Sequence, residues 1–300
     1  MNKQINFAIV LILLVVLSVG TFIGVTAGTL LFDLVYPEET ALGSSDSEST
    51  SDSTTQTSDQ TTADTNKPED QTPKKKIALT FDDGPSTTNT NAILDLLEQY
   101  NAKATFFVCG ERLTIGTTST LQRTIALGCE IGNHTFSHKD MRNLSQSELL
   151  QEIRETNEKI EQYSGTNYQC KLYRPPYGNI NLAAMNTLYD DGLRMYSVHW
   201  SSDSLDWQYQ SRYNKGEITR SEAIEGAFDT IVRETTDGTV ILMHDIHGIT
   251  VDVLKLVLEK YTAEGYEFVT VSELFGLEDN ASKEAYFNCY YSENRITPKN

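Results

Sequence analysis

The sequence predicts an α/β fold in which parallel strands close into a barrel. From Lys76 onward, short apolar runs alternate with amphipathic stretches in strict strand-helix order. The apolar runs are continuous and β-branched, as expected of strands that are covered on both faces. Seven such runs favour a parallel sheet, which closes naturally into a barrel, and an open doubly wound sheet is the alternative. No G-x-G-x-x-G motif follows the first strand, which weakens a dinucleotide-binding interpretation.

Each expected element has its own pattern. The predicted strands are residues 77–81, 104–108, 130–133, 171–173, 195–200, 240–243 and 268–271. The predicted helices are residues 91–99, 121–126, 147–163, 182–189, 221–234 and 251–264. Ser145 and Glu148 form the pattern of a capping box before the third helix. Gly165, Gly192 and Gly265 follow helices, where C-terminal caps favour glycine.

The composition is that of an acidic, folded chain. It has 300 residues and a formal net charge of −18, which suits one large α/β domain with accessory segments or two small domains. No basic surface is evident for binding phosphate backbones, so we expect no nucleic-acid partner.

The N-terminus predicts a membrane anchor. No charged residue occurs between Gln4 and Phe32, a run long enough to span a bilayer. We therefore expect a short cytoplasmic segment at residues 1–4 and a single transmembrane signal anchor at residues 5–32. Lys3 precedes the run and acidic residues follow it, which favours an extracellular body. The alternative is a long signal peptide that is cleaved after Ala27, and then the body is secreted.

The remaining regions are a tether, a catalytic domain and a tail. Residues 33–74 are predicted to be a disordered, acidic, Ser/Thr-rich linker, because residues 43–72 contain almost no large apolar side chains. The catalytic domain is expected at residues 75–277. The tail, residues 278–300, either packs on the barrel or is mobile. A disulfide between Cys170 and Cys289 and four unpaired thiols, Cys109 and Cys129 included, are both open.

Two motifs suggest a metal site. Asp82 and Asp83 end the first strand, where two adjacent carboxylates resist joint ionisation unless a cation relieves their repulsion. His134 and His138 follow the third strand, and a spacing of four places two imidazoles on one face of a helical turn. One carboxylate and two imidazoles make a three-ligand set with open positions, which is typical of catalytic zinc, iron or cobalt.

Three further motifs follow other strands. Residues 174–178 read Arg-Pro-Pro-Tyr-Gly, residues 203–207 read Asp-Ser-Leu-Asp-Trp, and residues 241–245 end in His244 and Asp245. A proline turn, a buried Trp and a core histidine are the ordinary interpretations. However, all five motifs fall at the C-terminal ends of predicted parallel strands, which converge on one catalytic face in a βα barrel.

Together these motifs resemble the polysaccharide deacetylase family, carbohydrate esterase family 4, with its NodB-like domain. The five ordered motifs of that family match residues 80–84, 134–138, 174–178, 203–207 and 242–244, and the similarity covers about residues 75–276. The resemblance implies a distorted (β/α)7 barrel and a divalent metal, usually zinc, with cobalt or nickel as substitutes.

The resemblance also implies roles for individual residues. Metal ligands would be Asp83, His134 and His138. Asp82 would be the general base, oriented by Arg174, and His244 the general acid, with Asp203 as its carboxylate partner. The backbone N–H of Tyr177 would stabilise the oxyanion, and Trp207, Leu242 and Pro176 would line the substrate site.

The implied reaction is removal of acetyl groups from an extracellular polysaccharide. A monomer that deacetylates N-acetylglucosamine in peptidoglycan fits an anchored body, and an intact Tyr177 favours N-acetylglucosamine over N-acetylmuramic acid. Chitin-like oligomers, poly-N-acetylglucosamine and acetyl-xylan are alternative substrates. The rival functions are a non-catalytic wall-binding pseudoenzyme and a metal amidase that acts on a small amide.

Overall fold

The computed structural model describes residues 74–291 and 294–296. The predicted cytoplasmic segment and membrane anchor, and the linker up to residue 73, lie outside the described residues. Among the helices that the structure describes, none combines the length and the apolar character needed to cross a bilayer.

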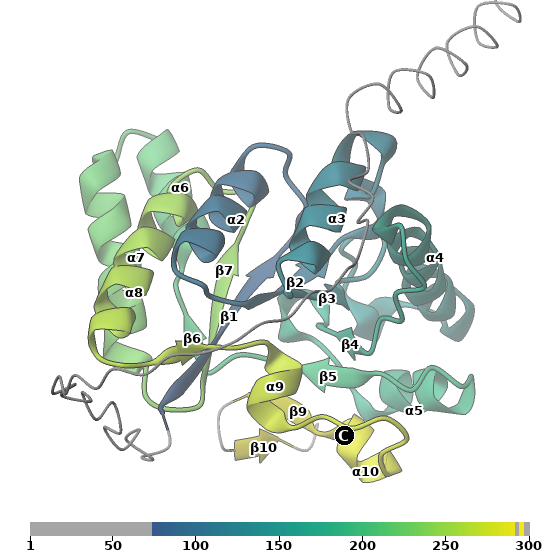
Figure 1. Ribbon diagram of the computed structural model, residues 1–300. Coiled ribbons are helices and arrows are strands. Elements are labelled where there is room, and N and C mark those ends of the chain that lie inside the picture. Colours follow the sequence, from purple (N-terminus) through teal and green to yellow (C-terminus); the bar gives the residue numbers. More distant parts are fainter. Residues whose placement is uncertain (1–73, 292–293, 297–300) are drawn as a thin grey trace, which may run out of the picture. The chain divides into compact units, whose positions relative to one another are not determined.

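One sheet dominates the described part of the chain (Figure 1). Its strands are β1 (Lys76–Asp82), β2 (Ala104–Val108), β3 (Glu130–Asn133), β4 (Leu172–Tyr173), β5 (Tyr196–Val198), β6 (Ser202–Asp203), β7 (Thr239–His244), β8 (Glu267–Phe268), β9 (Cys289–Tyr291) and β10 (Asn294–Ile296). The order is β10-β9-β5-β4-β3-β2-β1-β7-β6, with β8 beside β1. All these pairs are parallel except β9 with β10. The strands curl into a half-barrel. The predicted barrel is not closed, since no pair joins the two end strands among the described residues.

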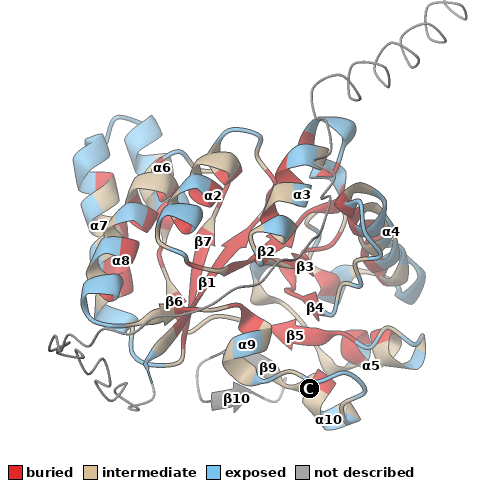
Figure 2. Cartoon of the chain, in the orientation of Figure 1, coloured by how far each residue is buried: buried red, intermediate tan, exposed pale blue. Residues whose placement is uncertain are grey.

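Helices follow most of the strands. They are α2 (Asn89–Gln99), α3 (Thr118–Ala126), α4 (Gln146–Ser164), α5 (Leu182–Asp190), α6 (Asp206–Asn214), α7 (Arg220–Glu234), α8 (Thr250–Ala263), α9 (Val271–Phe275) and α10 (Lys283–Phe287). The predicted capping box of Ser145 and Glu148 opens α4, and Gly165 ends it in the left-handed conformation. Figure 2 shows that the central strands β1, β2, β3 and β7 are mostly buried and that the helices are exposed on their outer faces.

The alternation along β1 decides which side chains reach the interior of the half-barrel. Ile77, Leu79 and Phe81 join the core cluster that includes residues of α2 and α8. Successive side chains of a strand point to opposite faces, so Thr80 and Asp82 point away from those helices. In the parallel register, Asp82 lies beside His244 of β7. The strand pattern therefore brings a carboxylate and an imidazole together at one end of the sheet.

The C-terminal segment differs from the sequence prediction. A strand was expected at residues 268–271, but β8 ends at Phe268 and α9 begins at Val271. The reason is local, because the Thr270 side chain accepts a hydrogen bond from the Glu273 N–H and caps a helix.

The described part of the tail packs on the half-barrel. Tyr286 of α10 is buried, and its ring centroid lies 4.6 Å from that of Tyr196. The backbone of β9 extends the sheet beside β5. Cys109, Cys129 and Cys170 are free thiols, whereas the side chain of Cys289 is outside the described residues.

Candidate active site

A cavity of about 430 Å³ opens at the C-terminal ends of the strands. All five sequence motifs contribute to it, as the barrel geometry predicts. Its walls are formed by Asp82, Asp83, His134, His138, Tyr177, Trp200, Asp203, Trp207, Leu242 and His244. Trp200, at the end of the predicted fifth strand, also lines the cavity although it belongs to none of the five motifs.

Asp83, His134 and His138 form a cluster that could hold a metal ion. One potential ligand atom from each residue lies within 4.8 Å of the others. The Nε2 atoms of His134 and His138 lie 3.5 Å and 3.2 Å from the Asp83 Oδ1 atom. That oxygen is buried and has no hydrogen-bond partner among the described residues. A bound cation would satisfy it, so the donor set fits a metal.

The surroundings of His134 suit a ligand. Its Nδ1 atom lies 2.7 Å from the carbonyl oxygen of Arg174, which leaves Nε2 facing the carboxylates. Burial lowers the pKa of His134, more strongly than the charges of Asp82 and Asp83 raise it. The imidazole is therefore neutral at physiological pH, which is the form that binds metals.

The loop between the two histidines is not the helical turn that the sequence predicts. Thr135 and His138 both have left-handed backbones, with φ values of 64° and 55°. The Asn133 side chain accepts a hydrogen bond from the Thr135 N–H at 2.8 Å, which stabilises this path. The two imidazoles thus converge through an irregular loop, with ring centroids 5.0 Å apart.

Glu152 of α4 holds this loop in place through hydrogen bonds to its carboxylate. Its carboxylate accepts hydrogen bonds from the N–H groups of Phe136 and Ser137, at 2.8 Å and 2.7 Å, and from the Ser137 hydroxyl at 2.6 Å. Lys139 adds an ion pair at 3.1 Å. Burial raises the pKa of Glu152, but the contacts from Ser137 and Lys139 outweigh it and lower the pKa overall. The ionised carboxylate therefore fixes the segment between the two histidines.

Arg174 contacts Asp82 directly, as predicted. Its Nη1 atom donates to the Oδ1 atom of Asp82 and to the hydroxyl of Thr80, both at 2.8 Å. The guanidinium is fully buried and lies 4.2 Å from the centroid of the Phe107 ring. The other carboxylate oxygen of Asp82 faces His134 Nε2 at 3.6 Å. One oxygen of Asp82 is thus anchored, and the other points toward the ligand cluster.

The carboxylate that pairs with His244 is Asp206, and the prediction of Asp203 was wrong. Asp206 Oδ1 lies 2.7 Å from His244 Nδ1, and its Oδ2 accepts from the His244 N–H and the Thr250 hydroxyl. Leu205, with φ of 54°, turns the chain so that Asp206 faces back toward β7. The Oδ1 atom of Asp203 instead accepts a hydrogen bond from the Leu205 N–H at 2.9 Å.

The charge state of His244 follows from this pairing. Burial alone lowers the pKa of His244, but the Asp206 carboxylate and its hydrogen bond, with smaller effects of Asp82 and Asp83, raise it to about 9. The imidazole is therefore protonated at neutral pH, and its Nε2–H is available to the cavity.

The predicted substrate-binding residues occupy different positions. Tyr177 and Trp207 are 65% and 47% exposed at the cavity mouth, whereas Leu242 is buried in its wall. The Tyr177 backbone is left-handed, with φ of 60°, and its ring lies 4.7 Å from that of His138. Pro176 is buried and is not among the lining residues, so the predicted contact of its side chain with the cavity is wrong. Pro176 is the first residue of the short turn Pro176–Gly178, which contains Tyr177.

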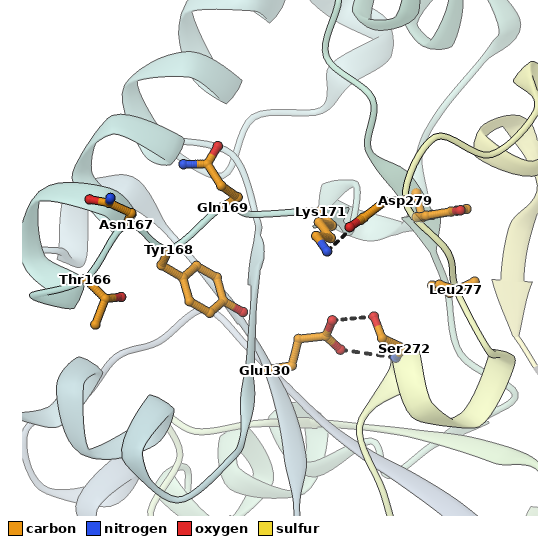
Figure 3. Close-up of a pocket in the computed structure, with 10 residues that line it drawn as sticks. Glu130, Thr166, Asn167, Tyr168, Gln169, Lys171, Ser272, Leu277 and Asp279 are labelled. Carbon is orange, nitrogen blue, oxygen red and sulfur yellow. Dashed lines mark hydrogen bonds and ion pairs between the residues drawn. The ribbon is translucent and has the colours of Figure 1, made fainter.

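A larger hollow, of about 610 Å³, lies at the opposite ends of the strands. Figure 3 shows Glu130 hydrogen-bonded to Ser272 and Lys171 paired with Asp279. The Tyr168 hydroxyl accepts from the Ile131 N–H at 2.7 Å. These polar groups are already paired with one another, so they stabilise the underside of the sheet. The chemistry is concentrated in the other cavity.

Comparisons with known proteins agree with this geometry. The family model described as polysaccharide deacetylase matches residues 69–196. The chain is 37% identical over 214 residues to the peptidoglycan-N-acetylglucosamine deacetylase PgdA of Listeria monocytogenes. The aligned region covers 71% of this chain and 41% of that protein. It is 39% identical over 201 residues to the peptidoglycan-N-acetylmuramic acid deacetylase PdaC of Bacillus subtilis, covering 67% and 39%.

Solved structures give the same result. The structure of PdaC from Bacillus subtilis matches with a TM-score of 0.58 and 38% identity, over 68% of this chain and 91% of that chain. A family 4 acetyl xylan esterase from Clostridium thermocellum, in complex with a cobalt ion, matches with a TM-score of 0.62 and 32% identity, over 73% and 99%. The chain therefore belongs to the polysaccharide deacetylase family. It spans about two fifths of the length of the curated relatives given above.

Proposed function

We propose that this protein is a metal-dependent deacetylase that removes acetyl groups from N-acetylglucosamine residues of peptidoglycan and releases acetate. One observation carries the proposal. An anchored carboxylate, a ligand cluster and a protonated histidine converge on one cavity, through Asp82, Asp83 and His244. These are the groups that hydrolysis of an amide requires. A pseudoenzyme of this fold would be expected to lack one of them.

The metal is proposed to be zinc, with cobalt or nickel as substitutes, held by Asp83, His134 and His138. Bound there, a divalent cation would lower the pKa of a water molecule toward about 7 and would polarise the acetamide carbonyl. The Asp83 Oδ1 atom, which has no hydrogen-bond partner among the described residues, and the neutral His134 ring support this assignment. The cobalt ion described with the acetyl xylan esterase supports a divalent metal in a similar protein.

The protein's own groups then move the protons. Asp82 is the general base, because its unanchored oxygen faces the ligand cluster and can take a proton from the attacking water. The Tyr177 N–H is the proposed donor to the oxyanion. His244 donates its Nε2 proton to the departing nitrogen, since an amine leaves poorly without protonation. Asp206 keeps that proton on His244 at neutral pH.

The substrate and the setting are also part of the proposal. Exposed Tyr177 and Trp207 at the mouth suit the face of a sugar in a polymer, and an open rim suits a polymer better than a small amide. The apolar N-terminal run supports a single-pass anchor with the catalytic domain outside the cell, or secretion after cleavage. We propose that the protein acts as a monomer on an acetylated polysaccharide.

Replacing Glu152 by Gln should weaken metal binding. The substitution puts an amide in place of the carboxylate that receives the N–H groups of Phe136 and Ser137, so the loop carrying both histidines loses its support. Loss of a residue that holds metal ligands in position typically weakens metal binding about 10- to 100-fold. Competition with a chromophoric chelator measures the zinc affinity. Glu158→Gln, on the exposed face of the same helix, is the matched control and should bind zinc as the wild type does.

Replacing Asp206 by Asn should move the alkaline limb of activity to lower pH. His244 acts as an acid only while protonated, and Asp206 is the main group that raises its pKa. With the carboxylate removed, the pKa falls and the acid is lost at lower pH. The pH dependence of kcat/KM measures this shift. Asp203→Asn is the matched control, because Asp203 lines the same cavity without bonding to the His244 ring. A larger shift in the Asp203 variant would contradict the assignment.

A panel of three substrates tests the proposed activity. Purified peptidoglycan, a chitooligosaccharide and acetyl-xylan are each incubated with the full chain, and acetate is measured. Acetate from peptidoglycan, at the highest kcat/KM, is the expected result. Preference for acetyl-xylan would replace the substrate but keep the chemistry, whereas no acetate from any of the three would refute the enzymatic function.

A further inference from the structure

A second hollow lies on the same rim as the active-site cavity, and an arginine borders it. It has a volume of about 340 Å³ and is lined by Pro85, Ser86, Thr87, Arg112, Thr117 and Ile246. These residues come from the loops after β1, β2 and β7, which are neighbouring strands. We call this hollow the rim pocket.

The rim pocket adjoins the catalytic machinery. Pro85 is two residues beyond Asp83, and Ile246 is two residues beyond His244. The Cys109 N–H donates to the carbonyl of Gly84 at 3.0 Å, which joins the loops that supply Asp83 and Arg112. A polymer that places one sugar in the active-site cavity would therefore lay an adjacent unit across the rim.

The backbone of Arg112 is held by hydrogen bonds, whereas its guanidinium is unpaired among the described residues. Its N–H donates to the carbonyl of Cys109 at 3.0 Å, and its carbonyl accepts from the Thr117 hydroxyl at 2.9 Å. The guanidinium has no ion pair or hydrogen bond among the residues that the structure describes. Two other cations near the histidine loop are paired, Lys139 with Glu152 and Arg142 with Asp140.

Arg112 is close enough to His247 for its charge to act on that imidazole. Burial chiefly lowers the pKa of His247, and the charges of His244 and, to a smaller extent, Arg112 add to the lowering. The His247 ring lies 5.7 Å from the His244 ring. In a chain with a net charge of −18, an unpaired arginine at this place is a local site for an anion.

We propose that the rim pocket is a subsite for a carboxylate of the substrate, with Arg112 as its recognition residue. The inference rests on the proposed function and deepens it. In peptidoglycan, the sugar next to each N-acetylglucosamine carries a lactyl group, whose carboxyl is either free or amide-linked to a peptide with carboxyl groups of its own. Chitin oligomers and acetyl-xylan carry no carboxyl group there. A guanidinium and the hydroxyls of Ser86 and Thr87 are suitable donors to a carboxylate. Arg112 thus selects the acidic polymer over neutral ones.

The test compares acidic and neutral forms of one substrate. Soluble peptidoglycan oligosaccharides with free carboxylates, the same oligosaccharides with those carboxylates converted to methylamides, and chitotetraose are given to the full chain. The kcat/KM for acetate release is measured for the wild type, Arg112→Ala and Arg112→Lys. Lys215→Ala, an exposed cation at the end of α6, is the matched control.

Arg112→Ala should lower kcat/KM about threefold to tenfold on the acidic oligosaccharide, through KM, because the pair is partly exposed. It should leave the rates on the methylamide and chitotetraose at the wild-type level, and Arg112→Lys should restore part of the loss. The preference of the wild type for the acidic form should shrink at 1 M salt, where the screening length is about 3 Å. Equal losses on acidic and amidated forms, or no loss on the acidic form, would overturn the subsite. Absence of acetate from every substrate with the wild type would instead refute the proposed function.

Discussion

Replacing Asp82 by Asn should lower acetate release about 100- to 10,000-fold while metal binding is retained. The amide keeps the shape of the side chain and can still meet Arg174, which holds the Oδ1 position at 2.8 Å. The amide cannot take a proton from water. Among the described residues, no other carboxylate in the cavity has one anchored oxygen and a second oxygen that faces the ligand cluster. Steady-state kinetics and a zinc titration of the same preparation measure the two effects.

The adjacent residue supplies the matched comparison. Asp83→Asn, one position along the chain, should lose both metal affinity and activity, because its Oδ1 is the oxygen shared by the two histidines. The two variants differ only in which of two neighbouring carboxylates is neutralised. If Asp82→Asn also lost zinc, Asp82 would be a ligand and not the base.

Removing a histidine ligand should have the second large effect. His134→Ala should release the metal and abolish turnover, since it removes a buried Nε2 atom that faces Asp83. His134 is also part of the buried interior, so His138→Ala is the necessary companion. The His138 side chain is partly exposed, and its loss should remove the metal without unfolding the domain.

The readouts for the histidine variants are metal content and thermal unfolding. His247→Ala is the control, because His247 lies near His244 but outside the ligand cluster. It should keep the metal. A His138→Ala variant that retained zinc and full activity would remove the basis of the proposed centre.

The sequence predicted the parallel strands well where apolar runs were long. The runs of β1, β2 and β7 are buried on both faces, and their patterns were unambiguous. The short elements were missed or misplaced for physical reasons. β6 and β8 have two residues each, too few for any periodicity, and the expected last strand ends early because Thr270 caps a helix.

The site was predictable as a set of residues but not as a set of contacts. Asp203 and Asp206 lie three positions apart in one motif, and composition cannot tell which of them reaches His244. The left-handed turn at Leu205 decides the matter in favour of Asp206. The sequence signal that could have identified Asp206 is its position beside Trp207 at the start of a helix. Similarly, the spacing of the two histidines alone suggested a helical turn. The left-handed backbones of Thr135 and His138 instead bring the two imidazoles together through an irregular loop.

Metal-dependent deacetylation is tested by measuring acetate release from purified peptidoglycan before and after treatment with a chelator. The chelated protein should release no acetate, and adding zinc should restore the activity of the wild type. His138→Ala should stay inactive at the same zinc concentration, because its ligand set is incomplete. Acetate release that is unchanged by complete removal of the metal would refute a metal-dependent deacetylase.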